Sequence, residues 1–455
     1  MNKDTIAIVL AAGEGTRMKS KTKKVMQNVA GKALAQWVVE AAREATGNAP
    51  VLVIGADADD VRDYFGGRAR YALQNEQLGT GHAVLSAQEY LKGDGYVIVT
   101  AGDMPLIEAD TYRAIADKAQ AENLGVCVLT AVLDDPSGYG RVVRGSDGVQ
   151  SIVEHKDATP AQRKICEVNT SVYCFAIPLL IEALKNLKND NVQGEYYLPD
   201  CVEYITNKGH KAEAVAAKDA SACVGVNDFV QLAQAGKLLR RRICESLMRS
   251  GVCIIDPDST YIGPDVKIGQ DTVVHPGVTL EGETVIGADT VLYPGSRIVS
   301  SEIGSGTTVQ NSVLLSAKVG DNTTIGPYAY LRPGTDIGNG CRVGDFVEVK
   351  NAVIKDGAKV SHLSYIGDGE VGEKSNIGCG VVFVNYDGQK KSRTVVGKNA
   401  FIGCNANLIA PVTVEDGAYV AAGSTVTKDV PKDALGVARC RQKNIEGWAK
   451  KRREE

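Results

Sequence analysis

The stretch YIGPDVKIGQDTVVHPGVTLEGETVIGADTVLYPGSRI, residues Tyr261–Ile298, decides the fold of the C-terminal half, because an aliphatic residue returns in it at every sixth position. A period of six matches neither the 3.6 residues of an α-helix nor the two of a β-strand, so it indicates a repeat architecture. Hexapeptide repeats form a parallel β-helix, a prism in which the recurring aliphatic side chain points inward and stacks on its copies in neighbouring coils. The recurring positions are Ile262, Ile268, Val274, Leu280, Ile286, Leu292 and Ile298, then Val319, Ile325, Leu331, Ile337, Val343 and Val349, and finally Val396, Ile402, Leu408, Val414, Val420 and Val426.

A glycine often follows the recurring aliphatic residue, as in Ile268-Gly269 and Ile402-Gly403. We expect glycine at tight corners of the prism, where a Cβ atom would clash. The six-residue register breaks between Phe383 and Val396, which predicts that Asn385–Arg393 is a loop extruded from the prism. Such loops on a rigid scaffold commonly carry function. The pattern predicts a β-helix from about residue 252 to about residue 430.

The composition bounds the class of protein. A chain of 455 residues is too long for one hydrophobic core and predicts two or three domains. The net charge of −4 gives no sign of a nucleic-acid partner. No apolar run approaches the roughly 18 residues of a membrane span, so we expect no membrane partner. The eleven cysteines are scattered and never form a CxxC pair, which favours reduced thiols and a cytoplasmic protein over a disulfide framework or a zinc site.

The N-terminal half alternates short β-rich runs with amphipathic stretches, which is typical of a parallel α/β sheet. Helical spacing then predicts a connecting helix at 228–250, between an N-terminal domain at 1–227 and the β-helix domain with its charged tail at 251–455. The expected strands and helices are Ile6–Leu10, Val51–Ile54 and Val97–Thr100, and Ala33–Glu44 and Ala109–Ala121.

A glycine-rich loop follows the first predicted strand, in the sequence AAGEGTRM from Ala11 to Met18, and Lys24 comes shortly after it. Ligands in open α/β sheets bind beyond the carboxyl ends of strands. Glycines there let backbone N–H groups approach phosphate, and Arg17 and Lys24 supply positive charge. The spacing matches neither the dinucleotide fingerprint nor the P-loop, and a plain strand-to-helix turn stays open as the alternative.

A second loop, Ala101-Gly102-Asp103-Met104-Pro105, follows the strand Val97–Thr100. Asp103 could be an ordinary helix cap. If the turn instead holds its carboxylate beside the glycine-rich loop, this oxygen ligand next to a phosphate site suggests Mg²⁺. Asn227, just before the connecting helix, is the candidate for the second oxygen ligand.

Both halves resemble one bacterial family, the bifunctional N-acetylglucosamine-1-phosphate uridylyltransferases/glucosamine-1-phosphate N-acetyltransferases. The resemblance covers nearly the whole chain. It implies a Rossmann-like α/β nucleotidyltransferase domain followed by a left-handed parallel β-helix of hexapeptide repeats. The motifs that carry it are LAAGEGTRM (10–18), QLGTGHA (77–83), AGDMPLI (101–107), GYGRVV (138–143), EHKDA (154–158), NTS (169–171), QGEYYLPD (193–200) and GVND (225–228), with SHLSYIGD (361–368), NIGCG (376–380), VNYDG (384–388) and APVTV (410–414) in the β-helix.

For the N-terminal domain, the resemblance implies transfer of a uridylyl group from UTP to N-acetylglucosamine-1-phosphate, with release of pyrophosphate. It places Mg²⁺ on Asp103 and Asn227, and phosphates near Arg17 and Lys24. The remaining residues that it assigns are Leu10, Ala11, Ala12, Gly13, Gln74, Gly79, Thr80, Ala101 and Gly102 around the nucleotide, and Gly140, Glu154 and Asn169 on the acetylated sugar.

In the β-helix, His362 taken alone could be an ordinary surface histidine. The resemblance instead implies that it is the general base for acetyl transfer from acetyl-CoA to glucosamine-1-phosphate, a task that suits an imidazole at neutral pH. It also implies a homotrimer with the acetyl-transfer sites between subunits. The binding residues that it assigns are Arg332, Lys350, Tyr365 and Asn376 for the sugar phosphate, and Cys379, Asn385, Tyr386, Cys404, Ala422 and Arg439 for acetyl-CoA.

Three residues depart from the family pattern. Lys23 stands where the family usually has proline, Cys379 where alanine is common, and Cys404 where serine is common. The expected function is two-step synthesis of UDP-N-acetylglucosamine. A sugar-phosphate nucleotidylyltransferase with a merely regulatory β-helix is the first alternative, and a non-catalytic scaffold is the second. Consumption of acetyl-CoA and release of pyrophosphate from UTP distinguish the three.

Overall fold

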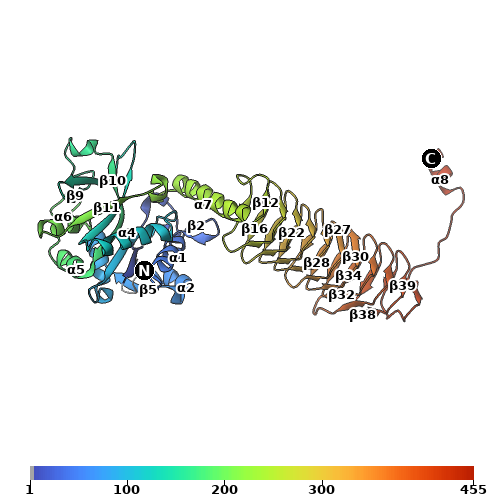
Figure 1. Cartoon of the computed structure of the whole chain (residues 1–455). Helices are drawn as coiled ribbons and strands as arrows, with labels where there is room; N and C mark the ends of the chain where they lie inside the picture. Colours follow the sequence, from blue (N-terminus) through green and yellow to red (C-terminus); the bar gives the residue numbers. More distant parts are fainter. Residues whose placement is uncertain (1–4) are drawn as a thin grey trace. The chain divides into compact units, whose positions relative to one another are not determined.

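The computed structural model describes residues 5–455 (Figure 1). The chain divides into two compact units between residues 239 and 240, a division that lies inside helix α7 (Phe229–Arg249). Ala235 and Leu239 on this helix belong to a core cluster of the N-terminal unit, and Cys244 belongs to the core of the C-terminal unit. No helix within the described residues is long and apolar enough to cross a membrane.

The N-terminal unit is built on one twisted sheet of nine strands, of which β9 and β10 run against the other seven. Strand β10 lies antiparallel to β6, β7 and β8, so the expected parallel sheet is corrected to a mixed one. The chain enters β10 from the hairpin of β8 and β9 without a crossover helix, and an antiparallel strand needs none. The order across the sheet is β11 (Ala212–Ala216), β7 (Val126–Val132), β10 (Glu167–Ala176), β6 (Tyr96–Ala101), β1 (Thr5–Leu10), β4 (Val51–Gly55) and β5 (Arg70–Gln74), and off this path β8 (Arg141–Gly145) pairs with β10 and β9 (Gly148–Val153) pairs with β8.

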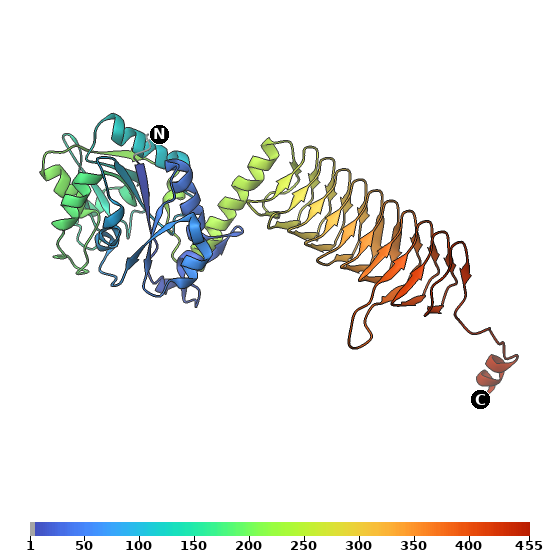
Figure 2. The same cartoon turned by 90° about the horizontal axis from the view of Figure 1, so that it is seen from below.

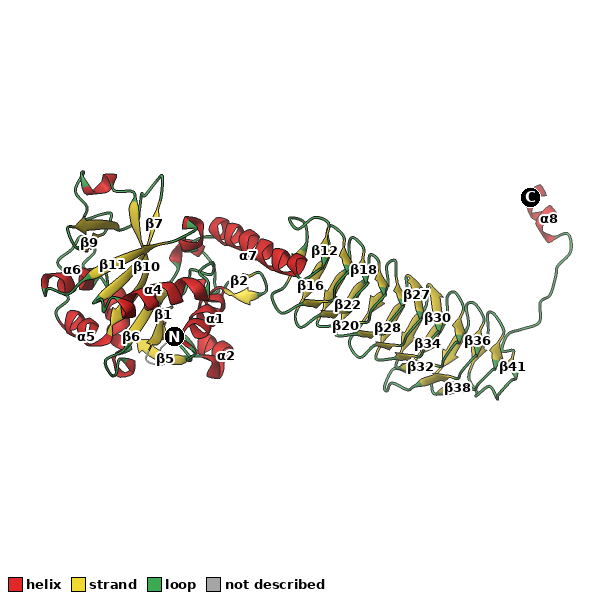
Figure 3. Ribbon diagram, viewed as in Figure 1, coloured by secondary structure: helices red, strands yellow, loops and turns green. Residues whose placement is uncertain are grey.

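Helices cover both faces of this sheet (Figure 3). Neighbouring residues of β1 point to opposite faces: Val9 packs in the cluster that contains α1 and α4, and Ile8 in the cluster that contains α3, α5 and α6. This doubly covered arrangement is Rossmann-like and confirms the expected fold, including the helices expected at Ala33–Glu44 and Ala109–Ala121. The helices are α1 (Leu34–Thr46), α2 (Asp59–Phe65), α3 (Thr80–Ser86), α4 (Ala109–Ala121), α5 (Ile177–Lys185) and α6 (Asp200–Asn207), and a small hairpin pairs β2 (Asn28–Val29) with β3 (Lys32–Ala33).

The C-terminal unit is a β-helix of three parallel sheets, which form the three faces of a prism. After its last coil the chain ends in α8 (Trp448–Glu454). The first face contains β12 (Cys253–Ile254), β15 (Val273–Val274), β18 (Val291–Leu292), β21 (Thr308–Val309), β24 (Thr324–Ile325), β27 (Arg342–Asp345), β30 (Lys359–His362), β33 (Asn376–Ile377), β36 (Phe401–Ile402), β39 (Tyr419–Val420) and β41 (Leu435–Gly436). The second contains β13 (Tyr261–Ile262), β16 (Thr279–Glu281), β19 (Arg297–Val299), β22 (Val313–Leu315), β25 (Tyr330–Leu331), β28 (Glu348–Lys350), β31 (Tyr365–Gly367), β34 (Val382–Val384), β37 (Asn407–Ile409) and β40 (Thr425–Val426). The third contains β14 (Lys267–Ile268), β17 (Val285–Ile286), β20 (Glu302–Ile303), β23 (Lys318–Val319), β26 (Asp336–Ile337), β29 (Val353–Ile354), β32 (Gly369–Val371), β35 (Thr394–Val396) and β38 (Val412–Val414).

The recurring aliphatic side chains form the core of the prism, as the six-residue period predicts. All of them are buried except Ile268, which is partly buried and lies on the first strand of the third face. The glycines that follow them allow neighbouring coils to pack closely. A Cβ on Gly269 would lie 2.5 Å from the backbone nitrogen of Ala288, and one on Gly403 would lie 2.4 Å from that of Ala422.

The predicted loop Asn385–Arg393 is confirmed, since β34 ends at Val384 and β35 begins at Thr394. Strand pairing shows the insertion directly. Lys359 pairs with Asn376, 17 residues later, but Asn376 pairs with Phe401, 25 residues later. The loop projects from the side of the β-helix (Figure 2).

Candidate functional site

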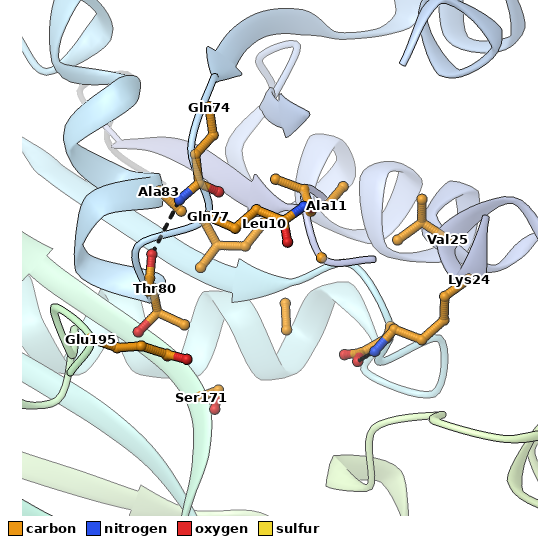
Figure 4. Close-up of a pocket in the computed structure, with 15 residues that line it drawn as sticks. Leu10, Ala11, Lys24, Val25, Gln74, Gln77, Thr80, Ala83, Ser171 and Glu195 are labelled. Atoms are coloured by element: carbon orange, nitrogen blue, oxygen red, sulfur yellow. Dashed lines mark hydrogen bonds and ion pairs between the residues drawn. The ribbon is translucent and has the colours of Figure 1, made fainter. Parts of the chain in front are cut away.

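The N-terminal unit has a pocket of 320 Å³ at the carboxyl ends of β1 and β6 (Figure 4). These strands are adjacent, Leu10 pairs with Ala101, and the Gly102 N–H donates to the Leu10 carbonyl at 2.8 Å. The two loops singled out in the sequence therefore meet at one edge of the sheet, as expected. Of the residues that line the pocket, ten were expected at the nucleotide or metal site: Leu10, Ala11, Ala12, Gly13, Lys24, Gln74, Gly79, Thr80, Ala101 and Asp103.

Lys24 brings the two candidate metal ligands together. Its ammonium donates to the Asp103 carboxylate and, at 3.3 Å, to the side-chain oxygen of Asn227. Arg17 donates to the same Asn227 oxygen at 2.8 Å. The Val226 N–H donates to the Asp103 carbonyl at 2.9 Å, which ties this segment to the Asp103 loop. The two oxygens thus reach a single cation, so this pair fits a divalent metal that takes its remaining ligands from water and phosphate.

The glycine-rich loop holds Lys24 by close packing. Gly15 has a left-handed backbone with φ of +62°, and a Cβ there would lie only 2.5 Å from the Cβ of Lys24. Lys23 has φ of −54°, a value that proline also adopts, so its departure from the family pattern leaves the backbone in a proline-like conformation. Its ammonium bonds the Asp57 carbonyl and the Asp60 carboxylate.

Lys24 and Thr80 lie toward opposite ends of the pocket (Figure 4). Near Thr80, Gln74 is 4% exposed and donates to the Gly79 carbonyl at 3.3 Å. Gln77, which the sequence reading did not assign, donates to the Ala12 carbonyl at 2.6 Å and so joins this end to the glycine-rich loop. Its only signal was its place at the start of the QLGTGHA motif. Four further lining residues were also not assigned: Val25, Ala83, Ser171 and Glu195.

The three residues expected on the acetylated sugar are brought together beside β10, although none of them lines the 320 Å³ pocket. The Asn169 N–H donates to the Gly140 carbonyl at 2.9 Å, and a Cβ on Gly140 would lie 3.1 Å from a carboxylate oxygen of Glu154. Burial raises the pKa of Glu154, with further contributions from Asp157 and Asp200. Buried groups that can donate and accept hydrogen bonds are suited to sugar hydroxyls and an acetamido group.

In the β-helix, the corner between the first and second faces stacks five residues, one from each successive coil, which we call the corner column. All five members occupy the same backbone position in their coils. The N–H of the residue that follows one member donates to the carbonyl of the member one coil earlier. These bonds run from Leu363 to Asp345 (2.9 Å), Gly380 to His362 (3.4 Å), Asn405 to Cys379 (2.7 Å) and Gly423 to Cys404 (2.8 Å). The corner column is Asp345, His362, Cys379, Cys404 and Ala422.

His362 therefore stands in line with three of the residues expected at acetyl-CoA. Its Nδ1 atom lies 2.7 Å from the Asp345 carboxylate. Arg439 continues this line, since its Cδ lies 3.9 Å from where a Cβ on Gly423 would be. The thiols of Cys379 and Cys404 are both on exposed residues.

A cluster of cations lies on the second face, close in sequence to His362. Lys350 pairs with Gly367, and the Tyr365 hydroxyl lies 2.5 Å from where a Cβ on Gly367 would be. Arg332 donates to Glu348 at 2.8 Å. Lys391, on the extruded loop, was not expected; the ammonium of Lys350 beside it lowers its pKa. Two ammonium groups this close favour an anion between them.

The remaining expected residues do not all meet within one copy of the chain. Asn385 begins the extruded loop at the other end of the second face from Cys379, and it donates to the Asp368 carboxylate. Tyr386 is exposed and donates to the Gly388 carbonyl within its own loop. Asn376 lies on the first face, three residues before Cys379.

All eleven cysteines are free. In the part of the chain that the structure describes, no three histidine, cysteine, aspartate or glutamate side chains gather as a metal site would require.

Comparison with known proteins supports both halves. Residues 7–165 match the MobA-like NTP transferase domain, and residues 316–351 and 393–428 match the bacterial transferase hexapeptide repeats. The chain is 51% identical over 449 residues to the bifunctional protein GlmU of Acetivibrio thermocellus, covering 98% of this chain and 97% of the relative. It is 50% identical over 446 residues to the bifunctional protein GlmU of Listeria innocua, covering 98% of each. At this identity over nearly the full length, the chain belongs to the GlmU family of bifunctional proteins.

Proposed function

We propose that the chain makes UDP-N-acetylglucosamine in two steps. In the first, the amine of glucosamine-1-phosphate attacks the thioester carbon of acetyl-CoA, and the coenzyme leaves as its thiol. In the second, a phosphate oxygen of the N-acetylated product attacks the α-phosphorus of UTP, and pyrophosphate leaves. The observation that carries this proposal is the presence of two separately built sites, the pocket around Lys24 and the corner column with its neighbouring cations.

For uridylyl transfer, the chain supplies positioning and positive charge, which are the main needs of phosphoryl-type transfer. Backbone N–H groups of Ala12 and Gly13 face the phosphates, whereas the Ala11 N–H donates to the Val53 carbonyl at 2.8 Å. Lys24 and Arg17 neutralise the charge of the phosphates. Asp103 and Asn227 would hold Mg²⁺, which supplies further charge neutralisation when bound. Gly140, Glu154 and Asn169 bind the acetylated sugar.

For acetyl transfer, His362 takes the proton that the sugar amine loses as the N–C bond forms and the C–S bond breaks. Arg332, Lys350 and Lys391 bind the sugar phosphate, because the adjacent ammonium groups of Lys350 and Lys391 favour a dianion and Arg332 directly follows β25, the strand that pairs with the strand of Lys350. Tyr365 and Asn376 bind the sugar ring. The coenzyme is bound by Cys379, Cys404, Ala422 and Arg439 in line with His362, and by Asn385 and Tyr386 at the extruded loop.

We also propose that the chain acts as a homotrimer, and two features support this. First, the coenzyme residues are divided between two corners of one prism, so a second copy is needed to bring both sets to one ligand. Second, Tyr328, Phe346 and Leu363 follow one another at the corner beside the column and are 58%, 59% and 59% exposed. Large apolar side chains gathered beside a site mark a protein interface.

The cytoplasm is the proposed location, because eleven free thiols suit a reducing compartment. The alternative, a β-helix with only a regulatory role, is not favoured, because such a role does not explain a histidine–carboxylate pair beside a cation cluster.

The proposal is tested by product analysis after incubation with glucosamine-1-phosphate, acetyl-CoA, UTP and Mg²⁺. We expect N-acetylglucosamine-1-phosphate first and UDP-N-acetylglucosamine after it. Formation of neither product would contradict the proposal.

A further inference from the structure

Asp345 is the carboxylate that contacts His362, and the fold places it there by strand pairing. The two residues pair across β27 and β30, and the carboxylate oxygen lies 2.7 Å from Nδ1 of the imidazole. Most strands of the first face have two residues, but these two have four, so that regular pairing extends to Asp345 and His362 at their ends. The backbone of His362 is also fixed, since its carbonyl accepts from the Ser364 hydroxyl at 2.8 Å.

The contact with Asp345 is needed to orient the imidazole of His362, because the backbone alone does not fix the direction of the ring. Within one copy of the chain, the side chain of His362 is 55% exposed and that of Asp345 is 40% exposed, so packing inside that copy restrains the imidazole little. Glu348, the next carboxylate after Asp345 along the chain, is already bonded to Arg332 at 2.8 Å. The hydrogen bond to His362 holds the pKa of Asp345 below its usual range, so the carboxylate stays ionised at neutral pH and accepts a proton-bearing nitrogen.

This arrangement decides which nitrogen of His362 can act as a base. When Nδ1 carries the proton and donates it to Asp345, the lone pair is on Nε2, which points away from the carboxylate. The partner on the far nitrogen of a catalytic histidine fixes its tautomer and its orientation.

We propose that Asp345 is a positioning residue for acetyl transfer, which holds His362 in the tautomer and rotamer that leave Nε2 free to take the proton of the sugar amine. This inference rests on the proposed role of His362 as the base. The essential property of Asp345 is an oxygen that accepts from Nδ1, and its negative charge is secondary. An asparagine of the same shape therefore replaces it in part, whereas an alanine does not.

The test measures initial rates of N-acetylglucosamine-1-phosphate formation by chromatography, with the full chain and its Asp345→Ala, Asp345→Asn, His362→Ala and Asp336→Ala variants. Asp336 is an exposed aspartate on the third face and serves as the matched control. Uridylyl transfer by the same preparations shows that the N-terminal unit of each variant is folded, and thermal melting followed by circular dichroism shows that its β-helix is folded. Loss of a residue that orients a catalytic group typically reduces activity about 10- to 100-fold.

For Asp345→Ala we expect kcat of acetyl transfer to fall about 10- to 100-fold, with both KM values within about twofold of the parent. For Asp345→Asn we expect kcat within about threefold of the parent, because the side-chain amide oxygen still accepts from Nδ1 of His362. Asp336→Ala should match the parent.

An unchanged kcat in Asp345→Ala, or an effect confined to KM, would overturn the inference while leaving the proposed function intact. Equal losses in Asp345→Asn and Asp345→Ala would also overturn it. Full acetyl transfer by His362→Ala would instead remove the proposed role of His362 itself, so the two failures are distinguishable.

Discussion

The candidate pocket of the N-terminal unit takes its side chains from segments scattered between residues 10 and 195, whereas the corner column of the β-helix repeats one backbone position coil after coil. In the pocket, charged side chains such as Lys24 and Asp103 contact one another across loops, and each depends on the other. In the column, the strand pairing places every member, and neighbours are aligned whether or not they interact. Activity at the pocket should therefore be sensitive to the loss of a single charged side chain. Activity at the corner column should be sensitive to changes in coil stacking and in the assembly of chains.

The largest effect is expected at the pocket. Asp103→Ala removes one of the two oxygens around Lys24 and leaves the ammonium without its carboxylate. We expect uridylyl transfer to fall at least about 10²- to 10³-fold, the usual loss for a group that stabilises charge at the reacting centre. Acetyl transfer should be unchanged. Asp110→Ala, at an aspartate whose side chain is 89% exposed, is the control and should retain both activities. Pyrophosphate release from UTP measures the effect, and a rate near that of the control would contradict the assignment.

A second prediction concerns the assembly of chains. Tyr328 has a positive φ of 59°, a conformation that aspartate tolerates, so Tyr328→Asp puts a charge on the apolar corner without backbone strain. We expect sedimentation equilibrium to show a trimer for the parent and a monomer for the variant. Acetyl transfer should fall at least about tenfold, with uridylyl transfer retained, because only the former site needs a second copy.

The control for this prediction is Val285→Asp, on the third face, where the valine is 42% exposed. It should sediment like the parent. A Tyr328→Asp variant that remains trimeric would move the interface to another surface.

The thiols of the column offer a smaller test. Cys379 and Cys404 are exposed and aligned with His362, so alkylation should inhibit acetyl transfer and spare uridylyl transfer, and acetyl-CoA should protect. The double variant Cys379→Ala with Cys404→Ser should be active and resistant. The exposed Cys166, Cys253 and Cys440 remain in it and act as internal controls for the reagent. Mass spectrometry that finds both column thiols alkylated without loss of acetyl transfer would contradict this prediction.

The smallest effect is a pH dependence of stability in the N-terminal unit. Burial, with Glu203 and Asp157 nearby, raises the pKa of Asp200 from 3.8 to about 6. A carboxyl group with a raised folded-state pKa stabilises the fold below its unfolded value and loses this contribution as pH rises through its folded value. Asp200→Asn should therefore melt at the same temperature as the parent near pH 4 and a few degrees higher near pH 8. Exposed Asp190→Asn should show no such difference. A gap between parent and Asp200→Asn that is constant with pH would contradict the assignment.

The sequence predicted the two regions to different depths. The six-residue period identified the buried positions of the β-helix, and the break after Phe383 located the extruded loop. The period could not predict which residues stack, because strand partners are separated by 16 residues at Arg297 and Val313 and by 25 at Asn376 and Phe401. The contact between Asp345 and His362 depends on this offset, so it needed the structure.

In the N-terminal unit, strand and helix patterns predicted the glycine-rich loop and the Asp103 loop at one sheet edge. They could not predict that β10 runs antiparallel, since local patterns carry no strand direction. The meeting of Asn227 with Lys24 joins residues 203 positions apart and also required the fold. Lys391 had no signal beyond its place in the extruded loop.

The central claim is that one chain carries two independent sites, and mixing two inactive variants tests it most directly. Supplied with glucosamine-1-phosphate, acetyl-CoA, UTP and Mg²⁺, Asp103→Ala alone should accumulate N-acetylglucosamine-1-phosphate, and His362→Ala alone should accumulate no product. Mixed, the two proteins should form UDP-N-acetylglucosamine, because the intermediate made by the first diffuses to the intact pocket of the second. A mixture of the two folded variants that makes none would contradict the account.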